Sequence, residues 1–418
     1  MTRMIHSVQL SGEIHVPPSK SDGQRALLLA ALAKGTSVIK NLGSSEDELA
    51  MLKCIQELGA DVQKDDAHVI TSGSINGSLD LHVGESGLAS RLLVPVCAAL
   101  SDYAFVSGSG SLLTRDMSFF ERTLPQMGVA VELKEGKFPI TLKGRLQPGT
   151  YEVDGSESSQ YISGLVIALS LLNADSQLVV HDLKSQPYLK MTLSSMKQFG
   201  IHPSYTDLSA FEIKGNQDFL ACEYTVEGDW SSASYWLVAS ALGQDVKVSG
   251  LDMSSAQADR MILQAFLSAG CRVVREGSSL SIDGSNRIPL NFDATDCPDL
   301  FPALAVYGAM TPGISKIRGV HRLANKESDR AKAIISEFGK LGVKAEIDED
   351  TLLIHGCSVL TGGQVDAHHD HRIAMSLAIL GTFSQFEIQI EGGDAVRKSY
   401  PGFWDDLEKL SVNQDKNA

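Results

Sequence analysis

The stretch 80-DLHVGESGLASRLLVPVCAAL-100 sets the pattern for the fold: a short strand, a glycine-containing turn and an apolar, alanine-rich helix. Five more stretches follow the same order, at residues 13–32, 151–172, 224–242, 290–310 and 363–381. Their turns reach the helix near Ser21, Ser86, Ser158, Ser231, Asp299 and His371, 65 to 73 residues apart. Such self-similarity is typical of a chain built from repeated units.

A second helix follows in each repeat and usually ends at a glycine before another strand, as in 48-ELAMLKCIQELGADVQ-63. A glycine there is a helix C-cap signal. The sequence therefore predicts an α/β protein of six β-α-β-α-β repeats, three in each of two lobes, with a boundary near Glu227–Asp229. The first helix of each repeat is apolar almost all round, so we expect it inside its lobe. If both lobes direct the N-termini of these helices at a shared cleft, anions are favoured there.

Composition limits the function. The net charge of −15 weighs against nucleic acid or an anionic membrane as the main partner, but allows a small anionic ligand. Six cysteines without a CxxC pair favour a reducing cytoplasm over a disulfide framework. The N-terminus lacks the apolar run of a signal peptide, and no apolar run is long enough to span a bilayer. We expect a cytoplasmic protein.

Cations gather at equivalent points of the repeats. Lys20 and Arg25 bracket a predicted helix start at which Ser21 is a good N-cap. Arg91 lies among leucines and needs a partner, either an anionic ligand or Glu85. The full set, with few carboxylates among them, is Lys20, Arg25, Arg91, Arg115, Lys326, Arg330, Arg372 and Lys398. Eight cations in one cleft of an acidic protein imply a ligand with several negative charges.

The segment 325-NKESDRAKA-333 leaves two interpretations open. If it is helical, Lys326, Glu327 and Arg330 share one sector of the helix. That sector is either a solvated surface or an anion clamp beside a proton carrier. Asp299, at the start of another helix, is likewise either a helix cap or a chemical group.

These motifs, in this order, resemble the 5-enolpyruvylshikimate-3-phosphate synthase family. The matching stretches are P-x-K-S-x-x-x-R-A from Pro18, G-x-x-G-x-x-x-R from Gly84, DGSxSSQ from Asp154, S-x-P-Y from Ser185, PD at 298–299, KESDR from Lys326, DHR from Asp370 and K-[ST]-[FY]-P from Lys398. The resemblance implies a transferase of aromatic amino-acid biosynthesis, with two lobes that are each an inside-out α/β barrel. Lobe 1 would hold residues 1–17 and 229–418 and lobe 2 residues 18–228, with crossovers near 17–19 and 226–229.

The resemblance also implies site residues, and no cofactor or metal. Shikimate-3-phosphate would contact Lys20, Ser21, Arg25, Ser158, Ser159, Gln160, Ser185, Tyr188, Asp299 and Lys326. Phosphoenolpyruvate would contact Lys20, Gly87, Arg115, Gln160, Arg330, Arg372 and Lys398, with support from Arg91 and His371. The catalytic residues would be Asp299, Glu327 and Lys20, with Glu327 protonating carbon C3 and Asp299 accepting the hydroxyl proton. The partners would be these two small molecules alone, and the protein would be a monomer.

Departures from the familiar pattern G-N-[AS]-G-T-x-x-R-P fall at Glu85, Leu88 and Leu92. An acidic Glu85 there bears on the affinity for phosphoenolpyruvate and on the response to glyphosate, the family's competitive inhibitor. A sister family, the enolpyruvyl transferases acting on UDP-N-acetylglucosamine, uses a cysteine in the loop equivalent to 110–116. This sequence has none there. A metal-dependent hydrolase and a non-catalytic phosphate-binding scaffold are more distant alternatives.

The hydrolase alternative rests on 364-QVDAHHDHRIAM-375, where five of six residues from Asp366 to His371 are possible metal ligands. The stretch is also the sixth copy of the repeated helix start, where the other copies carry anion-binding groups. We therefore predict Arg372 as its important member, with His371 beside the phosphate and Asp370 orienting or capping. The sequence assigns no role to His368 or His369.

Overall fold

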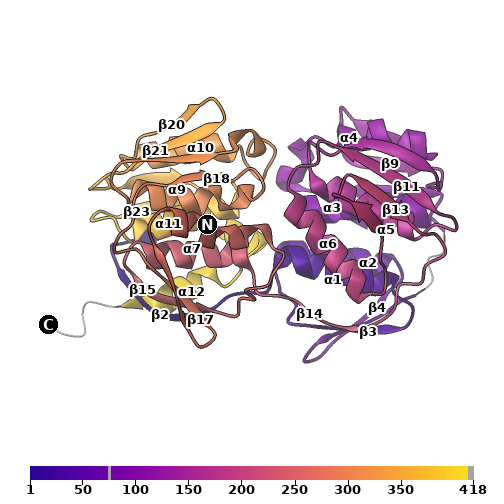
Figure 1. Ribbon diagram of the computed structural model, residues 1–418, viewed down its shortest axis with the longest axis horizontal. Helices are drawn as coiled ribbons and strands as arrows, with labels where there is room; N and C mark the ends of the chain where they lie inside the picture. Colours follow the sequence, from indigo (N-terminus) through magenta and orange to yellow (C-terminus); the bar gives the residue numbers. More distant parts are fainter. Residues whose placement is uncertain (74–76, 413–418) are drawn as a thin grey trace. The chain divides into compact units, whose positions relative to one another are not determined.

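The computed structural model describes residues 1–73 and 77–412. Internal contacts divide the chain into two compact units (Figure 1). Unit 1 consists of Met1–Pro17 with Glu227–Ala418, and unit 2 of Pro18–Val226.

Unit 2 contains three four-stranded sheets, ordered β14-β3-β5-β4, β6-β7-β9-β8 and β10-β11-β13-β12. Its elements are α1 (Lys20–Leu32), β3 (Thr36–Lys40), α2 (Glu46–Glu57), β4 (Asp61–Lys64), β5 (His68–Thr71), β6 (Leu79–His82), α3 (Gly87–Leu100), β7 (Tyr103–Ser107), η1 (Gly110–Thr114), α4 (Ser118–Thr123), η2 (Leu124–Met127), β8 (Ala130–Lys134), β9 (Lys137–Lys143), β10 (Thr150–Asp154), α5 (Ser159–Ser170), β11 (Ser176–His181), α6 (Gln186–Gln198), β12 (Ser204–Thr206), β13 (Ala210–Ile213) and β14 (Glu223–Thr225).

Unit 1 also contains three sheets, ordered β16-β17-β15-β2-β24, β18-β19-β21-β20 and β1-β23-β22. Its elements are β1 (Arg3–Ile5), β2 (Gln9–His15), α7 (Trp230–Ala241), β15 (Asp245–Ser249), η3 (Ala258–Met261), α8 (Ile262–Ser268), β16 (Arg272–Glu276), β17 (Ser279–Asp283), β18 (Asn291–Asp293), η4 (Pro298–Leu300), α9 (Phe301–Ala309), β19 (Ile314–Arg318), η5 (Val320–Arg322), α10 (Arg330–Lys340), β20 (Ala345–Asp348), β21 (Thr351–His355), β22 (Gly363–Asp366), α11 (His371–Gly381), β23 (Ile388–Glu391), η6 (Gly393–Lys398), α12 (Phe403–Leu410) and β24 (Ser411–Val412).

The predicted α/β repeat is confirmed, with one addition. In the repeat that begins at β6, β6 and β7 are parallel and flank α3, and β8 and β9 form a hairpin that pairs antiparallel with β7. The hairpin adds a fourth strand to the predicted β-α-β-α-β unit. Five sheets of the described chain share this order, and in the sixth β1 pairs antiparallel with β23 instead.

Two first strands are exchanged between repeats. β2 precedes α1 along the chain, yet it pairs in parallel with β15 of unit 1. β14 precedes α7, yet it pairs in parallel with β3 of unit 2. The chain thus passes from one unit to the other after β2 and again after β14.

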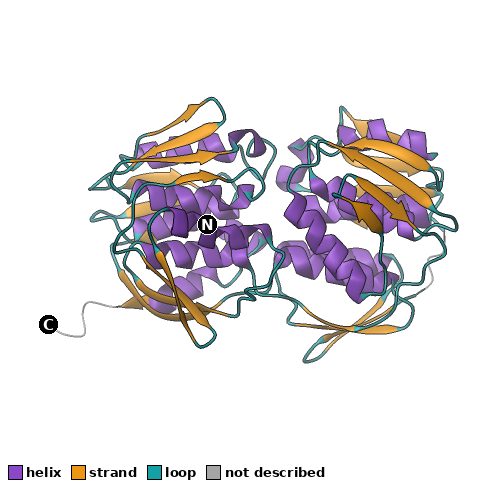
Figure 2. Ribbon diagram, in the orientation of Figure 1, coloured by secondary structure: helices purple, strands orange, loops and turns teal. Residues whose placement is uncertain are grey.

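The first helix of each repeat lies inside its unit, as predicted from its apolar surface (Figure 2). Twelve consecutive residues of α3, Gly87 to Ala98, are buried, and so are all nine residues of α9. Strands surround these helices in both units. Burying the helices fixes their polar N-terminal ends, where the candidate site residues lie. Within the described residues, none of the helices is both long and apolar enough to cross a membrane.

Candidate active site

Asp299 is the centre of a charged network in unit 1. Its Oδ1 accepts a hydrogen bond from Arg330 Nη1 at 2.7 Å and lies 3.3 Å from Lys326 Nζ. Its Oδ2 accepts from Arg372 Nη2 at 3.0 Å. Burial acts to raise the pKa of Asp299, but Arg372, Lys326 and Arg330 together hold it well below its usual range. Asp299 is therefore an ionised carboxylate, which has no proton to donate.

Arg330 joins the other carboxylates of this network. Its side chain is 1% exposed and donates to Glu327 Oε2 at 2.6 Å and to Asp370 Oδ2 at 2.8 Å, besides Asp299. Burial opposes its charge, but Asp370 and the other carboxylates raise the pKa of Arg330 above its usual range. One guanidinium thus holds the two predicted proton carriers, Asp299 and Glu327, in one cluster.

The loop before α10 corrects the helix expected over 325–333. The helix begins only at Arg330, where Asp329 is the N-cap and accepts from Lys332 N at 3.3 Å. Lys326 and Glu327 lie in the preceding turn, so they do not share a helical sector with Arg330. They reach the cluster because the turn carries them to Arg330 and Asp299. Burial lowers the pKa of Lys326, and Asp299 acts in the opposite direction.

The predicted cap at Ser21 was wrong, and the cap alternative for Asp299 is excluded. The N-cap of α1 is Ser19, whose Oγ accepts from Asp22 N, whereas Ser21 lies within the helix. Asp299 lies inside the 3₁₀ turn η4, where no side chain caps the helix, and its carboxylate is used by cations instead. Asp370 does cap α11, accepting from Arg372 N at 2.9 Å, as the sequence predicted.

The stretch 366–371 distributes its polar groups among different partners. Asp370 binds Arg330, His368 Nε2 lies 2.9 Å from Glu337 Oε1, and the His369 carbonyl accepts from Lys398 Nζ at 2.9 Å. His371, the first residue of α11, is 1% exposed. Over the described ranges, no group of three or more His, Cys, Asp or Glu side chains is placed to hold a metal ion.

Unit 2 holds its cations differently. Arg25 is fully buried and donates to Thr192 Oγ1 at 2.8 Å, to the Ser21 carbonyl at 2.6 Å and to the Tyr188 carbonyl at 3.2 Å. Burial lowers its pKa to about 10, with Asp22 acting in the opposite direction. These bonds fix the start of α1 against α6, where Ser185 and Tyr188 lie.

Arg91 and Arg115 converge on Gly87, the first residue of α3. A Cβ atom added at Gly87 would lie 2.5 Å from Arg115 Nη1 and 2.9 Å from Arg91 Nη1. Arg91 donates to Gln160 Oε1 at 2.9 Å, and its guanidinium lies 5.0 Å from the ring centre of Tyr161. The alternative partner, Glu85, instead accepts from Ser111 N and Ser111 Oγ, each at 2.9 Å. Two guanidiniums beside a helix N-terminus suit an anion.

Hydrogen bonds connect the starts of α1, α3 and α5. Gln24 accepts from Ser86 Oγ at 2.8 Å, which links α1 to the N-cap of α3. Arg91 of α3 reaches Gln160 at the start of α5, where Ser158 is the N-cap. Unit 2 therefore brings together the predicted residues Lys20, Ser21, Gly87, Arg91, Ser158, Ser159 and Gln160 around three adjoining helix starts.

Several partners were missed from the sequence. Lys20 Nζ lies 2.9 Å from Asp47 Oδ2, a residue of the acidic first turn of α2 that no motif singled out. Asp370 and Asp47 show that the cations have more carboxylate partners than we expected. Asp259, also missed, is 2% exposed and accepts from Ser231 Oγ. Burial first, and then Asp299, raise its pKa to about 6.

The departures from the family pattern have distinct places. Leu92 is fully buried and Leu88 is 6% exposed, so both pack in the core of unit 2.

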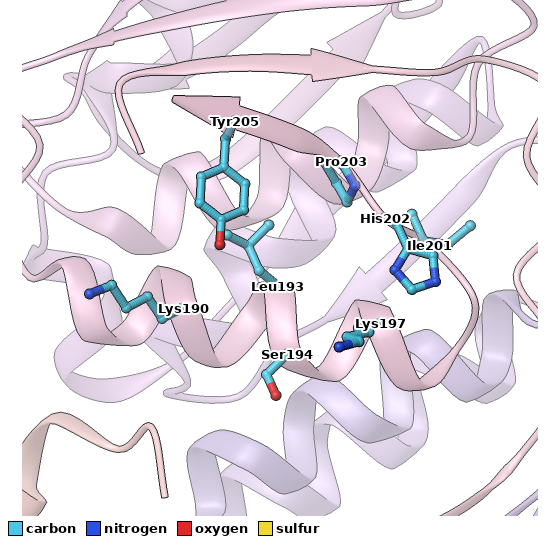
Figure 3. Close-up of a pocket in the computed structure, with 8 residues that line it drawn as sticks. All are labelled: Lys190, Leu193, Ser194, Lys197, Ile201, His202, Pro203 and Tyr205. Carbon is cyan, nitrogen blue, oxygen red and sulfur yellow. The ribbon is translucent and has the colours of Figure 1, made fainter. Parts of the chain in front are cut away.

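A surface pocket of unit 2 is lined by α6, by β12 and by the segment between them, with Lys190, Lys197, His202 and Tyr205 around it (Figure 3). None of the predicted site residues lines this pocket.

Comparison with known proteins gives the same family from sequence and fold. The model for EPSP synthase (3-phosphoshikimate 1-carboxyvinyltransferase) matches residues 5–407. The 3-phosphoshikimate 1-carboxyvinyltransferase of Clostridium kluyveri is 35% identical, covering 99% of this chain and 98% of its own. That of Clostridium perfringens strain SM101 is 37% identical, covering 96% of each chain.

Solved structures share the fold at lower identity. EPSP synthase from Acinetobacter baumannii has a TM-score of 0.82 at 22% identity, covering 99% of this chain and 98% of its own. The enolpyruvyl transferase NikO from Streptomyces tendae has a TM-score of 0.75 at 17% identity, covering 97% and 96%. The predicted fold class is confirmed, and with the full-length match of sequence the chain belongs to the EPSP synthase (3-phosphoshikimate 1-carboxyvinyltransferase) family.

Proposed function

We propose that this protein transfers the carboxyvinyl group of phosphoenolpyruvate to the 5-hydroxyl of shikimate-3-phosphate and releases phosphate. The observation that carries the proposal is the pairing of Asp299 and Glu327 through Arg330. The reaction needs one group to protonate carbon C3 and another to accept the hydroxyl proton. Two carboxylates held by one buried guanidinium, one of them firmly ionised, suit these two tasks.

The reaction proceeds by addition of the hydroxyl to phosphoenolpyruvate and then by elimination of phosphate. Glu327 donates a proton to C3 of phosphoenolpyruvate, which makes C2 electrophilic, and the substrate 5-hydroxyl adds to C2 as Asp299 takes its proton. The tetrahedral intermediate then expels phosphate from C2, and the Glu327 carboxylate takes back a proton from C3, which restores the double bond. The proton held by Asp299 leaves with the phosphate. Lys20, the third predicted catalytic residue, assists as a cation. Because Asp299 is ionised, it can be only the base of the pair and not the acid.

The cations are assigned to the negative charges of the substrates. Phosphoenolpyruvate carries a phosphate and a carboxylate, which planar guanidiniums bind with two hydrogen bonds each. We assign it to Lys20, Gly87, Arg115, Gln160, Arg330, Arg372 and Lys398, with Arg91 and His371 in support. We assign shikimate-3-phosphate to Lys20, Ser21, Arg25, Ser158, Ser159, Gln160, Ser185, Tyr188, Asp299 and Lys326. Both clusters therefore serve one pair of substrates.

The deciding experiment measures phosphate release from phosphoenolpyruvate by the purified protein without added metal. We expect release with shikimate-3-phosphate and none with UDP-N-acetylglucosamine. A chelator should leave the rate unchanged. Release with the UDP sugar instead, or loss of activity on chelation, would reject the proposal. The predicted monomer is checked separately by light scattering during size-exclusion chromatography.

A further inference from the structure

The turn between β22 and α11 contains two successive residues with an unusual backbone. His368 has φ 52° and His369 has φ 54°, both in the left-handed region. Residues other than glycine adopt this region uncommonly, because it is strained for a residue with a Cβ atom. A pair of them persists only where the surrounding structure holds the turn firmly.

Three contacts hold the turn. His368 N donates to Asp366 Oδ1 at 2.7 Å, and Asp370 N donates to the Ala367 carbonyl at 2.8 Å. The third leaves the turn, because the His368 ring nitrogen Nε2 lies 2.9 Å from Glu337 Oε1 on α10. Glu337 Oε2 also accepts from Asp366 N at 2.8 Å.

Glu337 is a buried anchor for these bonds. Its side chain is 1% exposed, and Lys340 Nζ lies 2.7 Å from Oε2. Ser336 Oγ donates to Oε1 at 2.9 Å. Burial acts to raise the pKa of Glu337, but Lys340, His368 and the other donors lower it. A buried carboxylate bound by donors from its own helix and from the turn fixes the two segments to each other.

The same two segments carry the cations assigned to phosphoenolpyruvate. Helix α10 begins with Arg330, two turns before Glu337. The turn presents Asp370 to Arg330 Nε at 2.8 Å and the His369 carbonyl to Lys398 Nζ at 2.9 Å. Glu337 and His368 thus close a ring of contacts that runs along α10 to Arg330, across to Asp370 and back through the turn.

We infer that His368 and Glu337 form a positioning pair that sets Arg330, Arg372 and Lys398 in the geometry that binds an anion. The inference rests on the proposed function for the identity of that anion, the phosphate-bearing substrate phosphoenolpyruvate. Neither residue is assigned a contact with substrate. Their effect passes through the backbone of the turn to the phosphoenolpyruvate cations of unit 1. Most groups assigned to shikimate-3-phosphate lie in unit 2, and only Asp299 and Lys326 lie in unit 1.

The test replaces His368 with side chains that distinguish the effect of its left-handed backbone from the effect of its contact with Glu337. His368→Asn tolerates the left-handed backbone but cannot reach Glu337. His368→Gln places an amide donor near the position of Nε2. His368→Gly removes the ring and the backbone strain together, so it serves if the Asn variant fails to fold. The matched control is His355→Asn in the same unit, because His355 Nε2 lies 2.9 Å from Glu346 Oε1 between β21 and β20.

His368→Asn and His368→Gly should raise the KM for phosphoenolpyruvate by about tenfold, as expected for the loss of one hydrogen bond to a charged group. The KM for shikimate-3-phosphate should change less than about twofold, and His368→Gln should recover most of the loss. Calorimetry with inorganic phosphate should show weaker binding by the same two variants. His355→Asn should change none of these values.

Phosphate binding separates the two proposals, because it does not depend on the reaction. If the wild-type protein transfers no carboxyvinyl group but the His368 variants weaken phosphate binding, only the proposed function fails. The positioning pair is rejected by unchanged phosphate affinity in these variants, by a wild-type protein that binds no phosphate, or by equal changes in both KM values. An equal effect of His355→Asn would also reject it.

Discussion

Arg330 of unit 1 is held by a different kind of partner from Arg25 and Arg91 of unit 2. In unit 1, Arg330 contacts three carboxylates, those of Asp299, Glu327 and Asp370. In unit 2, Arg25 and Arg91 donate to neutral oxygens of hydroxyl, carbonyl and amide groups. A network of opposite charges can move and hold protons, whereas guanidiniums on neutral acceptors keep their positive charge for a ligand. The difference predicts that the Asp299–Glu327 network of unit 1 governs turnover, whereas Arg25 and Arg91 of unit 2 act through binding.

The largest expected effect is on turnover in unit 1. Glu327→Gln keeps the shape of the side chain but cannot donate the proton, so kcat should fall by roughly 10²- to 10⁴-fold. Both substrates should still bind with affinities close to those of the wild type, measured by calorimetry. Asp329→Asn is the control, because it removes a charge from the same loop and retains an oxygen that can cap α10. Near wild-type turnover in Glu327→Gln would remove Glu327 from the proton path.

The second effect is on the free energy of unfolding, compared between an arginine variant of each unit. Arg330→Met leaves buried carboxylates without their cation, which should cost about 3–5 kcal/mol. Arg25→Met leaves only neutral acceptors and should cost about 1–3 kcal/mol. All three tryptophans, Trp230, Trp236 and Trp404, lie in unit 1, so fluorescence during urea unfolding reports on that unit. Arg330→Met should shift this signal strongly, and calorimetry should detect the smaller change in Arg25→Met. Equal losses of unfolding free energy in the two variants would contradict the distinction between carboxylate and neutral partners.

The third effect tests binding in unit 2. In Gly87→Ala the new methyl group meets Arg115 Nη1 and Arg91 Nη1 at less than 3 Å, so both guanidiniums must move. We expect the KM for phosphoenolpyruvate to rise about tenfold with little change in kcat, since one charged hydrogen bond is worth about 1.5–3 kcal/mol. Gly339→Ala is the control, because its added methyl group meets nothing within 4 Å. A fall in kcat at unchanged KM would place Gly87 with the proton chemistry instead.

The smallest effect concerns Asp259, a carboxylate of unit 1 whose pKa moves opposite to that of Asp299. Its pKa is raised from 3.8 to about 6, so the folded protein holds this proton more tightly than the unfolded chain. Stability is therefore lost as pH rises between these values. Asp259→Asn should raise the melting temperature by a few degrees at pH 7.5 and much less near pH 4.5. A gain that does not depend on pH would show that charge is not the cause.

Local signals predicted much of this molecule. The repeated strand, turn and apolar helix located the six buried helices, and the cap at Asp370 was predicted from a side chain and its position. The exchange of β2 and β14 could not be derived from the repeat, because strand pairing depends on residues more than 180 positions apart. The expectation that the chain crosses between the units came from the family resemblance. The loop at 325–329 was mistaken for helix, since its charges match helical spacing while Asp329 begins the helix later.

Partners of buried charges were the other limit. The sequence showed that Arg91 needs a partner, but Gln160 lies 69 residues away in the next repeat and no local pattern connects the two. Asp47 and Glu337 were missed for the same reason, because nothing in the sequence around either acid connects it to its distant cation or histidine. Position in the repeat identified the cations. Only the packed structure identified what holds them.

The exchanged strand β2 has a consequence for how the chain is made. β2 ends at His15, and its parallel partner β15 begins at Asp245. At about 5–20 residues per second, a ribosome releases all of unit 2 during the tens of seconds that β2 waits for β15. Unit 2 can therefore finish folding first, while β2, an interior strand of its final sheet, remains open to pairing with other nascent chains. Chaperone demand during synthesis should concentrate on these first residues.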